Sequence, residues 1–332
     1  MREQRRRGRA GSTNVARWDR LPLIRTGRGS LDASAFAFVM ATGIVSVAAS
    51  AEGLAIVSDA LLVFAIAAWI GLASVVFPRA VRTPRRPRLQ SFALVASTAV
   101  IGARFALTGD DTPALALWSL ALLCYGVLLL SRPSTGDPSG GSLLIVVATE
   151  SLAVLAALLA PHSTAALLVA ALLAWTLGLC LYPLLTAAIA LALYRRPRFA
   201  PELWIVMGAL AIATLAGAEL LLATRTLRAL PELRGVLLNV DLTTWSLASS
   251  LIVPLLLAEV RSRDSWRYDA SRWSFVFPLG MYAVATKTLA QAGALPPLNR
   301  LGTVFSALAL AAWLVVLAGL ARRAVLGLRR AR

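Results

Sequence analysis

Ten apolar segments follow one another along this chain, and they restrict its fold more than any other feature. Each is close to the roughly 20 residues that an α-helix needs to cross about 30 Å of hydrocarbon. In hydrocarbon every backbone polar group must find its partner within the protein, which favours helices. We therefore predict an all-α integral membrane protein with ten transmembrane helices, at about residues 34–52, 57–77, 89–107, 114–131, 142–160, 164–194, 203–223, 236–260, 272–292 and 299–322.

Composition supports a lipid environment. Of the 332 residues, 58% are hydrophobic and only 15% are charged, which is too apolar for a soluble protein of this length. The net charge of +17 would suggest a nucleic-acid partner in a soluble protein, but here the position of the charges matters more than their sum. The predicted partner is the lipid bilayer, and no nucleic acid is expected.

The basic residues predict the orientation of the chain. Most of the 33 Lys and Arg residues lie in the first 30 residues, in the connections after even-numbered segments, and near the C-terminus. Cytoplasmic segments of membrane proteins carry such an excess. We predict a multi-pass protein of the cell inner (plasma) membrane with both termini cytoplasmic, divided into an Arg-rich tail (1–30), a transmembrane domain (31–323) and a basic C-terminal tail (324–332).

The segments also pair. Each odd-numbered segment follows an Arg-bearing stretch, and a short outer link joins it to the next even-numbered segment. This arrangement predicts five helical hairpins, which could form a ring. Polar residues at membrane depth fall mostly on the odd-numbered segments, where they should face protein or water. We therefore expect a central pore lined by the odd-numbered helices, with the even-numbered helices outside.

The candidate pore-lining residues are polar, small or aromatic side chains on these odd-numbered helices. Small residues also allow close helix packing in lipid, so a packing role is the alternative for each of them. The candidates are Phe38, Thr42, Ser97, Arg104, Thr149, Glu150, Gly208, Thr214, Met281 and Lys287.

The ninth segment carries the most distinctive face. Phe277, Met281, Val284, Thr288 and Gln291 recur at steps of four and three residues, which places them on one side of a helix. A proline follows Phe277 directly and removes a backbone hydrogen bond there. We predict that Phe277 forms a constriction, the alternative being an ordinary buried aromatic residue in a packed bundle.

Five ionisable residues fall at membrane depth, where charges are costly unless paired or hydrated. They are Arg104, Glu150, Glu219, Asp241 and Lys287. Arg104, Glu219, Asp241 and Lys287 lie in the outer half of the membrane, where they could form ion pairs or contact substrate. Glu150 stands near the middle of its helix and is either a protonated packing residue or a proton-coupling carboxylate.

Catalytic and metal-binding signatures are absent from the sequence. The single histidine, His162, lies in an outer link, and no Cys/His cluster, phosphate-binding loop or nucleophile–base set is present. We predict no cofactor and no enzymatic activity. A membrane-embedded lipid-modifying enzyme is a remote alternative.

Four stretches resemble the tellurite-resistance/dicarboxylate transporter family, which includes slow, voltage-dependent anion channels. They are FAFVMATGIVSVA (36–48), VVATESLAVL (146–155), WIVMGALAIATLAGAE (204–219) and RWSFVFPLGMYAVAT (272–286). The resemblance implies a homotrimer with one pore per subunit and an aromatic plug on the ninth helix, which matches Phe277 best and Phe275 less well. Glu150 departs from the family pattern, where a neutral polar residue is expected, and Lys287 adds a cation that could offset it if their helices meet.

The predicted function is therefore transport of anions through a central pore gated by an aromatic residue. The substrates implied are small inorganic anions, oxyanions or C4-dicarboxylates. The alternative is a proton-coupled dicarboxylate or tellurite carrier that uses Glu150.

Overall fold

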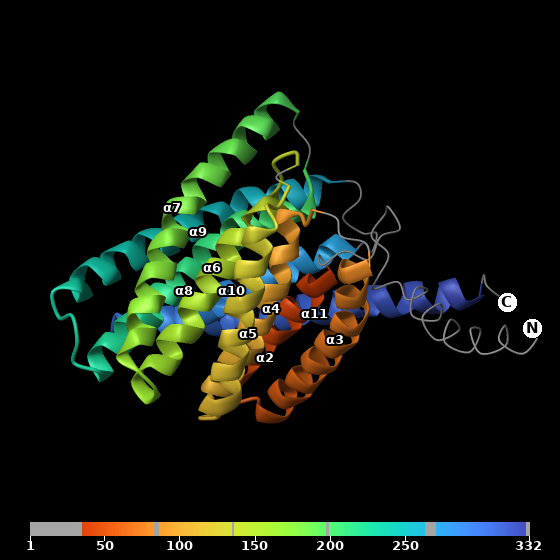
Figure 1. Ribbon diagram of the computed structural model, residues 1–332. Coiled ribbons are helices and arrows are strands. Elements are labelled where there is room, and N and C mark those ends of the chain that lie inside the picture. The colour runs from red at the N-terminus through yellow and green to blue at the C-terminus, as the bar shows by residue number, and fades with distance from the viewer. Residues whose placement is uncertain (1–34, 83–85, 135, 197–198, 263–269, 330–332) are drawn as a thin grey trace, which may run out of the picture.

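The computed structural model describes residues 35–82, 86–134, 136–196, 199–262 and 270–329. Ten α-helices account for most of these residues, which confirms the all-α prediction (Figure 1). The predicted Arg-rich tail, residues 1–30, lies outside the described residues. The helices are α2 (Phe36–Ala51), α3 (Ala55–Arg82), α4 (Ala93–Ala106), α5 (Asp111–Leu130), α6 (Leu144–Leu159), α7 (Ala165–Arg195), α8 (Trp204–Thr226), α9 (Leu233–Arg261), α10 (Trp273–Ala292) and α11 (Pro296–Arg329).

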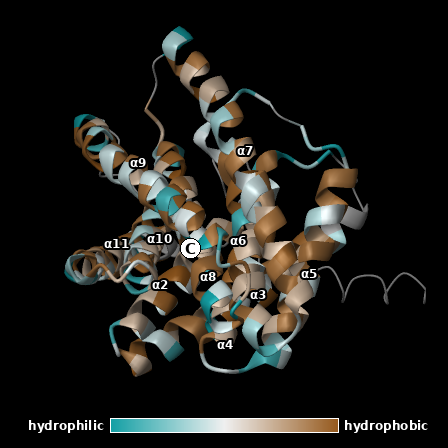
Figure 2. Ribbon diagram, turned by 90° about the vertical axis from the view of Figure 1, so that its left-hand side faces the viewer, coloured by the Kyte–Doolittle hydropathy of each residue, from teal (hydrophilic) through white to brown (hydrophobic). Residues whose placement is uncertain are grey.

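Eight helical segments are long and apolar enough to cross a membrane, counted over the described residues. Figure 2 shows that hydrophobic residues predominate along the helices. The two other helices are α2, which has 16 residues, and α10, which carries Lys287. The last helix, α11, continues to Arg329, so part of the predicted C-terminal tail is helical, and residues 330–332 lie outside the description.

One-turn 3-10 helices precede four of the even-labelled helices. They are η2 (Leu89–Phe92), η3 (Gly140–Leu143), η5 (Pro201–Leu203) and η6 (Ala270–Arg272). A 3-10 turn is a common start for a helix because it tightens the entry of the chain. Four of the five hairpins thus begin with the same kind of turn, although the sequences of the four turns differ.

Burial separates the ten helices into two layers. In the most apolar windows of the segments that contain α4, α6 and α8, 83–89% of residues are buried, whereas the windows of α3, α5, α7, α9 and α11 are only 17–28% buried. Nearly all residues of α2 and α10 are also buried. The inner layer is thus α2, α4, α6, α8 and α10, and the outer layer presents its large apolar side chains outward.

The inner helices form a closed ring. Each contacts the next in the order α2, α4, α6, α8, α10, and α10 returns to α2. Glycines permit the closest approaches: a Cβ on Gly43 would lie 2.8 Å from Val100 on α4, and one on Gly208 would lie 2.9 Å from Pro278 on α10. Small residues in lipid commonly serve this purpose.

Aromatic side chains of the outer layer hold the ring from outside. An outer helix bonds in each case to the inner helix of the next hairpin, and α11 bonds back to α2. The five contacts are Trp69 with Thr98, Tyr125 with Thr149, Trp175 with the Ala213 carbonyl, Trp245 with Thr286, and Trp313 with Thr42, at donor–acceptor distances of 2.8–3.1 Å.

The outer helix α7 is longer than a membrane crossing requires. With 31 residues, α7 spans about 46 Å at 1.5 Å per residue, and it remains one helix through Pro183. Its end projects beyond its neighbours in Figure 1. A helix of this length can cross the membrane at a tilt or extend beyond it to the interface.

Candidate functional site

A small cavity lies between the five inner helices. Its volume is about 30 Å³, enough for about two water molecules. Each inner helix contributes to the wall, and no outer helix does. The lining residues are Ile44, Val47, Ala99, Val100, Ala103, Leu107, Ser151, Val154, Leu158, Ile212, Leu215, Glu219, Met281 and Val284.

The cavity lies toward one end of the bundle. We call the end with the turns inside each hairpin the hairpin end, and the end with the connections between hairpins the loop end. Val47, Leu158 and Leu107 lie near the hairpin ends of their helices, whereas Ile44, Ala99 and Ser151 lie nearer the middle. The cavity therefore occupies the half of the bundle nearer the hairpin end.

Phe277 lies one helical turn beyond the cavity. It precedes Met281, a wall residue on α10, by four residues, so it lies about 6 Å nearer the loop end on the same face of the helix. Its side chain is fully buried. A bulky ring thus follows directly where the cavity ends.

The other aromatic candidates lie elsewhere. The Phe275 ring packs edge-on against Trp204 at the start of α8, with the ring centroids 4.7 Å apart. Phe38 packs between Phe64 on α3 and Trp273 on α10, at centroid distances of 5.4 and 4.7 Å.

Most predicted hydroxyl candidates bond to outer helices. Thr42 accepts a hydrogen bond from Trp313, Thr149 bonds with Tyr125, and Thr214 bonds with Thr244. Ser97 donates to the Leu94 carbonyl on its own helix. Together with Gly208, which packs against Pro278, these residues do not line the cavity. Of the predicted pore-lining residues, only Met281 does.

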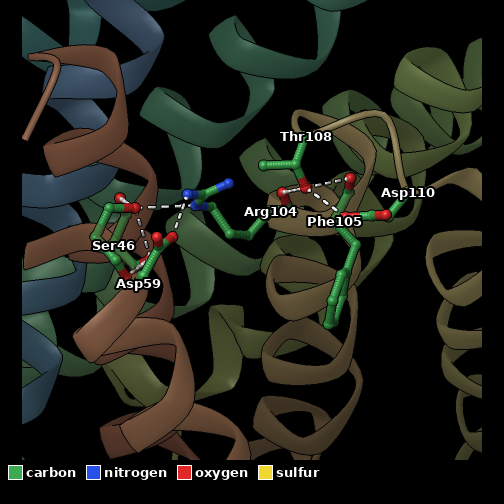
Figure 3. Close-up of polar contacts among 7 residues, drawn as sticks. Ser46, Asp59, Arg104, Phe105, Thr108 and Asp110 are labelled. Atoms are coloured by element: carbon green, nitrogen blue, oxygen red, sulfur yellow. Dashed lines mark hydrogen bonds and ion pairs between the residues drawn. The ribbon is translucent and has the colours of Figure 1, made fainter. Parts of the chain in front are cut away.

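Arg104 reaches from α4 to the first hairpin. Figure 3 shows its guanidinium extending away from α4, toward Ser46 and Asp59. Its Nε donates to Ser58 Oγ at 2.9 Å, and one terminal nitrogen lies 3.0 Å from Asp59 Oδ1. Arg104 is buried whereas 68% of the Asp59 side chain is exposed, so a carboxylate at the surface neutralises a buried cation.

Lys287 is neutralised in a similar way. Its Nζ lies 2.6 Å from Glu52 Oε1 and donates to the Ala51 carbonyl, while Thr303 on α11 donates to the other Glu52 oxygen. The partner of Lys287 is therefore Glu52 at the hairpin end, and no contact with Glu150 is formed. Partial burial raises the pKa of Glu52, but hydrogen bonds from Lys287 and Thr303 and the charge of Lys287 outweigh it and hold that pKa below its usual value.

Glu150 lies away from the cavity wall. Its carboxyl group packs against Gly178 on the outer helix α7, where any larger residue would collide with it. Asp241, on the outer helix α9, packs in the same manner against Gly217 on α8. Neither carboxyl group has a hydrogen-bond partner among the described residues. Each glycine thus makes room for a buried acid between an inner and an outer helix.

Glu219 does line the cavity, although sequence reasoning placed it only among the buried ionisable residues. The signal was present in the spacing: Ile212, Leu215 and Glu219 lie three and four residues apart, on one face of α8. The Thr288 hydroxyl on α10 interacts with the Glu219 carboxyl group.

Comparison with known proteins agrees with the architecture. Residues 30–321 match the family described as voltage-dependent anion channel. Over 136 residues, 40% of the chain, it is 34% identical to two uncharacterised membrane proteins of Mycobacterium tuberculosis, MT1776 of strain CDC 1551 and Rv1735c of strain H37Rv. The match covers 68% of each relative.

Proposed function

Because this chain belongs to the voltage-dependent anion channel family, a family of transport proteins rather than enzymes, we propose that it conducts small anions through the centre of its inner helical ring. It is a multi-pass membrane protein, and membership implies anion transport. The remote alternative of a lipid-modifying enzyme is therefore excluded.

One observation carries the proposed pathway. A cavity lined by all five inner helices ends where the buried ring of Phe277 follows on the same face of α10. We propose that displacement of that ring connects the cavity with the loop end. The proposal assigns the gate to Phe277 and not to Phe275, because the Phe275 ring packs against Trp204.

The chemistry of the wall favours weakly hydrated monovalent anions. Most of the lining side chains are apolar, and Ser151 supplies the one hydroxyl group among the lining residues described. Such a wall offers little to replace a tightly held hydration shell, so chloride and nitrate should pass more readily than sulfite or C4-dicarboxylates.

The proposal includes an orientation and an assembly. Because the connections at the loop end carry most of the arginines, we propose that the loop end faces the cytoplasm and that the cavity faces the outside of the inner membrane. A homotrimer with one pathway per subunit is proposed from the family resemblance. Glu150 lies off the cavity wall, and we do not assign a coupling proton to it.

The test is anion flux into liposomes that contain the purified protein, measured at a fixed membrane potential. Phe277→Ala should raise chloride and nitrate flux roughly tenfold or more, since each 1.4 kcal/mol removed from a barrier is worth about a factor of ten. Phe275→Ala removes the same ring from the same helix and is the matched control, for which we expect flux near that of the wild type.

Two outcomes would count against the proposal. Equal flux in Phe277→Ala and wild-type protein would remove Phe277 from the gate. Absence of flux for every anion in both proteins would contradict the conducting role itself.

A further inference from the structure

Glu219 is the single ionisable side chain on the cavity wall, counted over the described residues that line it. We propose that Glu219 is a proton-binding site within the anion pathway. Its carboxylate form excludes anions, and its protonated form admits them. The inference rests on the proposed function and adds a titratable group that determines when the pathway conducts.

The position of Glu219 makes its charge matter. It faces the cavity from α8, in a wall completed by apolar residues such as Leu215, Met281 and Val284. A charge in so small a space is poorly screened, because apolar walls and few water molecules leave a low effective dielectric. An anion in the cavity would lie within a few ångströms of the carboxylate and be repelled.

Protonation reverses the effect. A neutral carboxylic acid presents an O–H group, which can donate a hydrogen bond to an anion. The Thr288 hydroxyl beside it supplies a second group that can donate. The same side chain thus changes from a barrier to part of a binding site when it takes up one proton.

No described cation forms an ion pair with Glu219. On α4, across the cavity, Arg104 pairs with Asp59. On α10, Lys287 pairs with Glu52, and on α9, Arg234 donates to the Thr224 carbonyl. The acids of the helices packed against α8 lie beside glycines, Glu150 at Gly178 and Asp241 at Gly217. Cys180, in the middle of α7, and Arg225, in the last turn of α8, are exposed. The remaining titratable groups on those elements lie toward the ends of the bundle or bond elsewhere, and they are His162, Tyr182, Tyr194, Arg195, Glu202, Glu259, Arg261 and Tyr282.

The experiment is chloride and nitrate flux in liposomes, with the same pH on both sides, from about pH 5 to about pH 9, which brackets the range of partly buried carboxyl groups. Wild-type flux should rise about tenfold or more on acidification, because the protonated fraction falls about tenfold for each pH unit above the pKa. Glu219→Gln should give high flux that does not change with pH, and Glu219→Asp should keep a pH dependence.

Glu150→Gln is the matched control, since it makes the same substitution at a buried acid outside the cavity. We expect it to keep the wild-type pH dependence. Size-exclusion elution of each variant in detergent reports whether it is folded, and Glu219→Ala provides a second neutral side chain.

The possible failures are distinguishable. No flux in wild-type protein and Glu219→Gln at any pH contradicts the proposed function. Flux that is present, and that depends on pH equally in wild-type protein and Glu219→Gln, overturns the role of Glu219 alone. Loss of pH dependence in Glu150→Gln but not in Glu219→Gln also overturns it.

Discussion

At the scale of single residues, the buried charges of this bundle are treated in two ways. The cations Arg104 and Lys287, both on inner helices, reach acids of the first hairpin, Asp59 and Glu52. The acids Glu150 and Asp241 instead occupy space left by glycines, without a cation among their described contacts. Unpaired acids can become neutral by taking up a proton, whereas arginine cannot lose its charge inside a protein.

The ion pair between Glu52 and Lys287 predicts an acid-dependent stability. Because the folded protein holds the pKa of Glu52 below 4.5, the stabilisation is fully present above pH 4.5 and is lost as the pH falls through the lower folded value. The variant Glu52→Gln should lack this stabilisation at every pH. Thermal unfolding in detergent should therefore show a stability difference between wild type and Glu52→Gln that is constant near neutrality and shrinks in acid.

Lys287→Gln should also lose most of the stabilisation that the wild type loses in acid, since Lys287 supplies both a hydrogen bond and a charge to Glu52. Parallel loss of stability in all three proteins as the pH falls would mean that the pair does not contribute.

At the scale of helices, the approximate first and last residues of most helices could be predicted from the sequence. Which side of an inner helix faces which neighbouring helix could not. The segment predicted at 34–52 is the helix Phe36–Ala51, and the one predicted at 203–223 is Trp204–Thr226, because the length of an apolar run directly reflects a membrane crossing. Thr42 and Thr149 were expected to face the pathway, yet they bond to outer helices.

The physical reason lies in the surroundings of the inner helices. Protein covers them on every side, so no polar face distinguishes the pathway from the neighbouring helices. A threonine hydroxyl can also donate to the carbonyl four residues earlier, as Thr42 does to Phe38, and still accept a bond from a neighbouring helix. Contacts between helices far apart in sequence, such as α11 with α2, decide among these options.

The bond between Trp313 and Thr42 predicts a measurable coupling between α11 and α2. Combining Trp313→Phe with Thr42→Val in a double-mutant cycle should give a coupling energy of about 0.6 kcal/mol, the average for hydrogen bonds between transmembrane helices. Unfolding of the four proteins in detergent measures it. Trp313→Phe combined with Thr149→Val should be additive, because Thr149 bonds to Tyr125 instead.

At the scale of the whole molecule, the five hairpins share one arrangement, in which an aromatic side chain of each outer helix bonds to the next inner helix. Three of the five contacts run from a Trp indole N–H to a Thr hydroxyl, one runs from Trp175 to a backbone carbonyl, and one joins Tyr125 and Thr149. Alternation of basic connections and short links predicted the hairpins. The ring order and the bonds that close it needed the structure, since no repeated motif in the sequence marks them.

The layered ring, the cavity and the buried Phe277 together predict access from one side only. In a background with Cys124→Ala and Cys180→Ala, Val284→Cys places a thiol on the cavity wall. Ag⁺, a thiol-reactive ion small enough for so narrow a space, should modify it when added outside the cell, because the cavity lies toward the hairpin end. The same reagent added to inverted membrane vesicles should not, because Phe277 intervenes.

Val276→Cys is the control for that experiment, since Val276 is fully buried on α10 and is not part of the wall, so neither side should modify it. Adding Phe277→Ala to Val284→Cys should open access from the cytoplasmic side as well, because only the ring is removed. Modification of Val284→Cys from the cytoplasmic side alone would reverse the orientation inferred from the basic residues. Equal modification from both sides with Phe277 in place would show that the ring does not close the pathway.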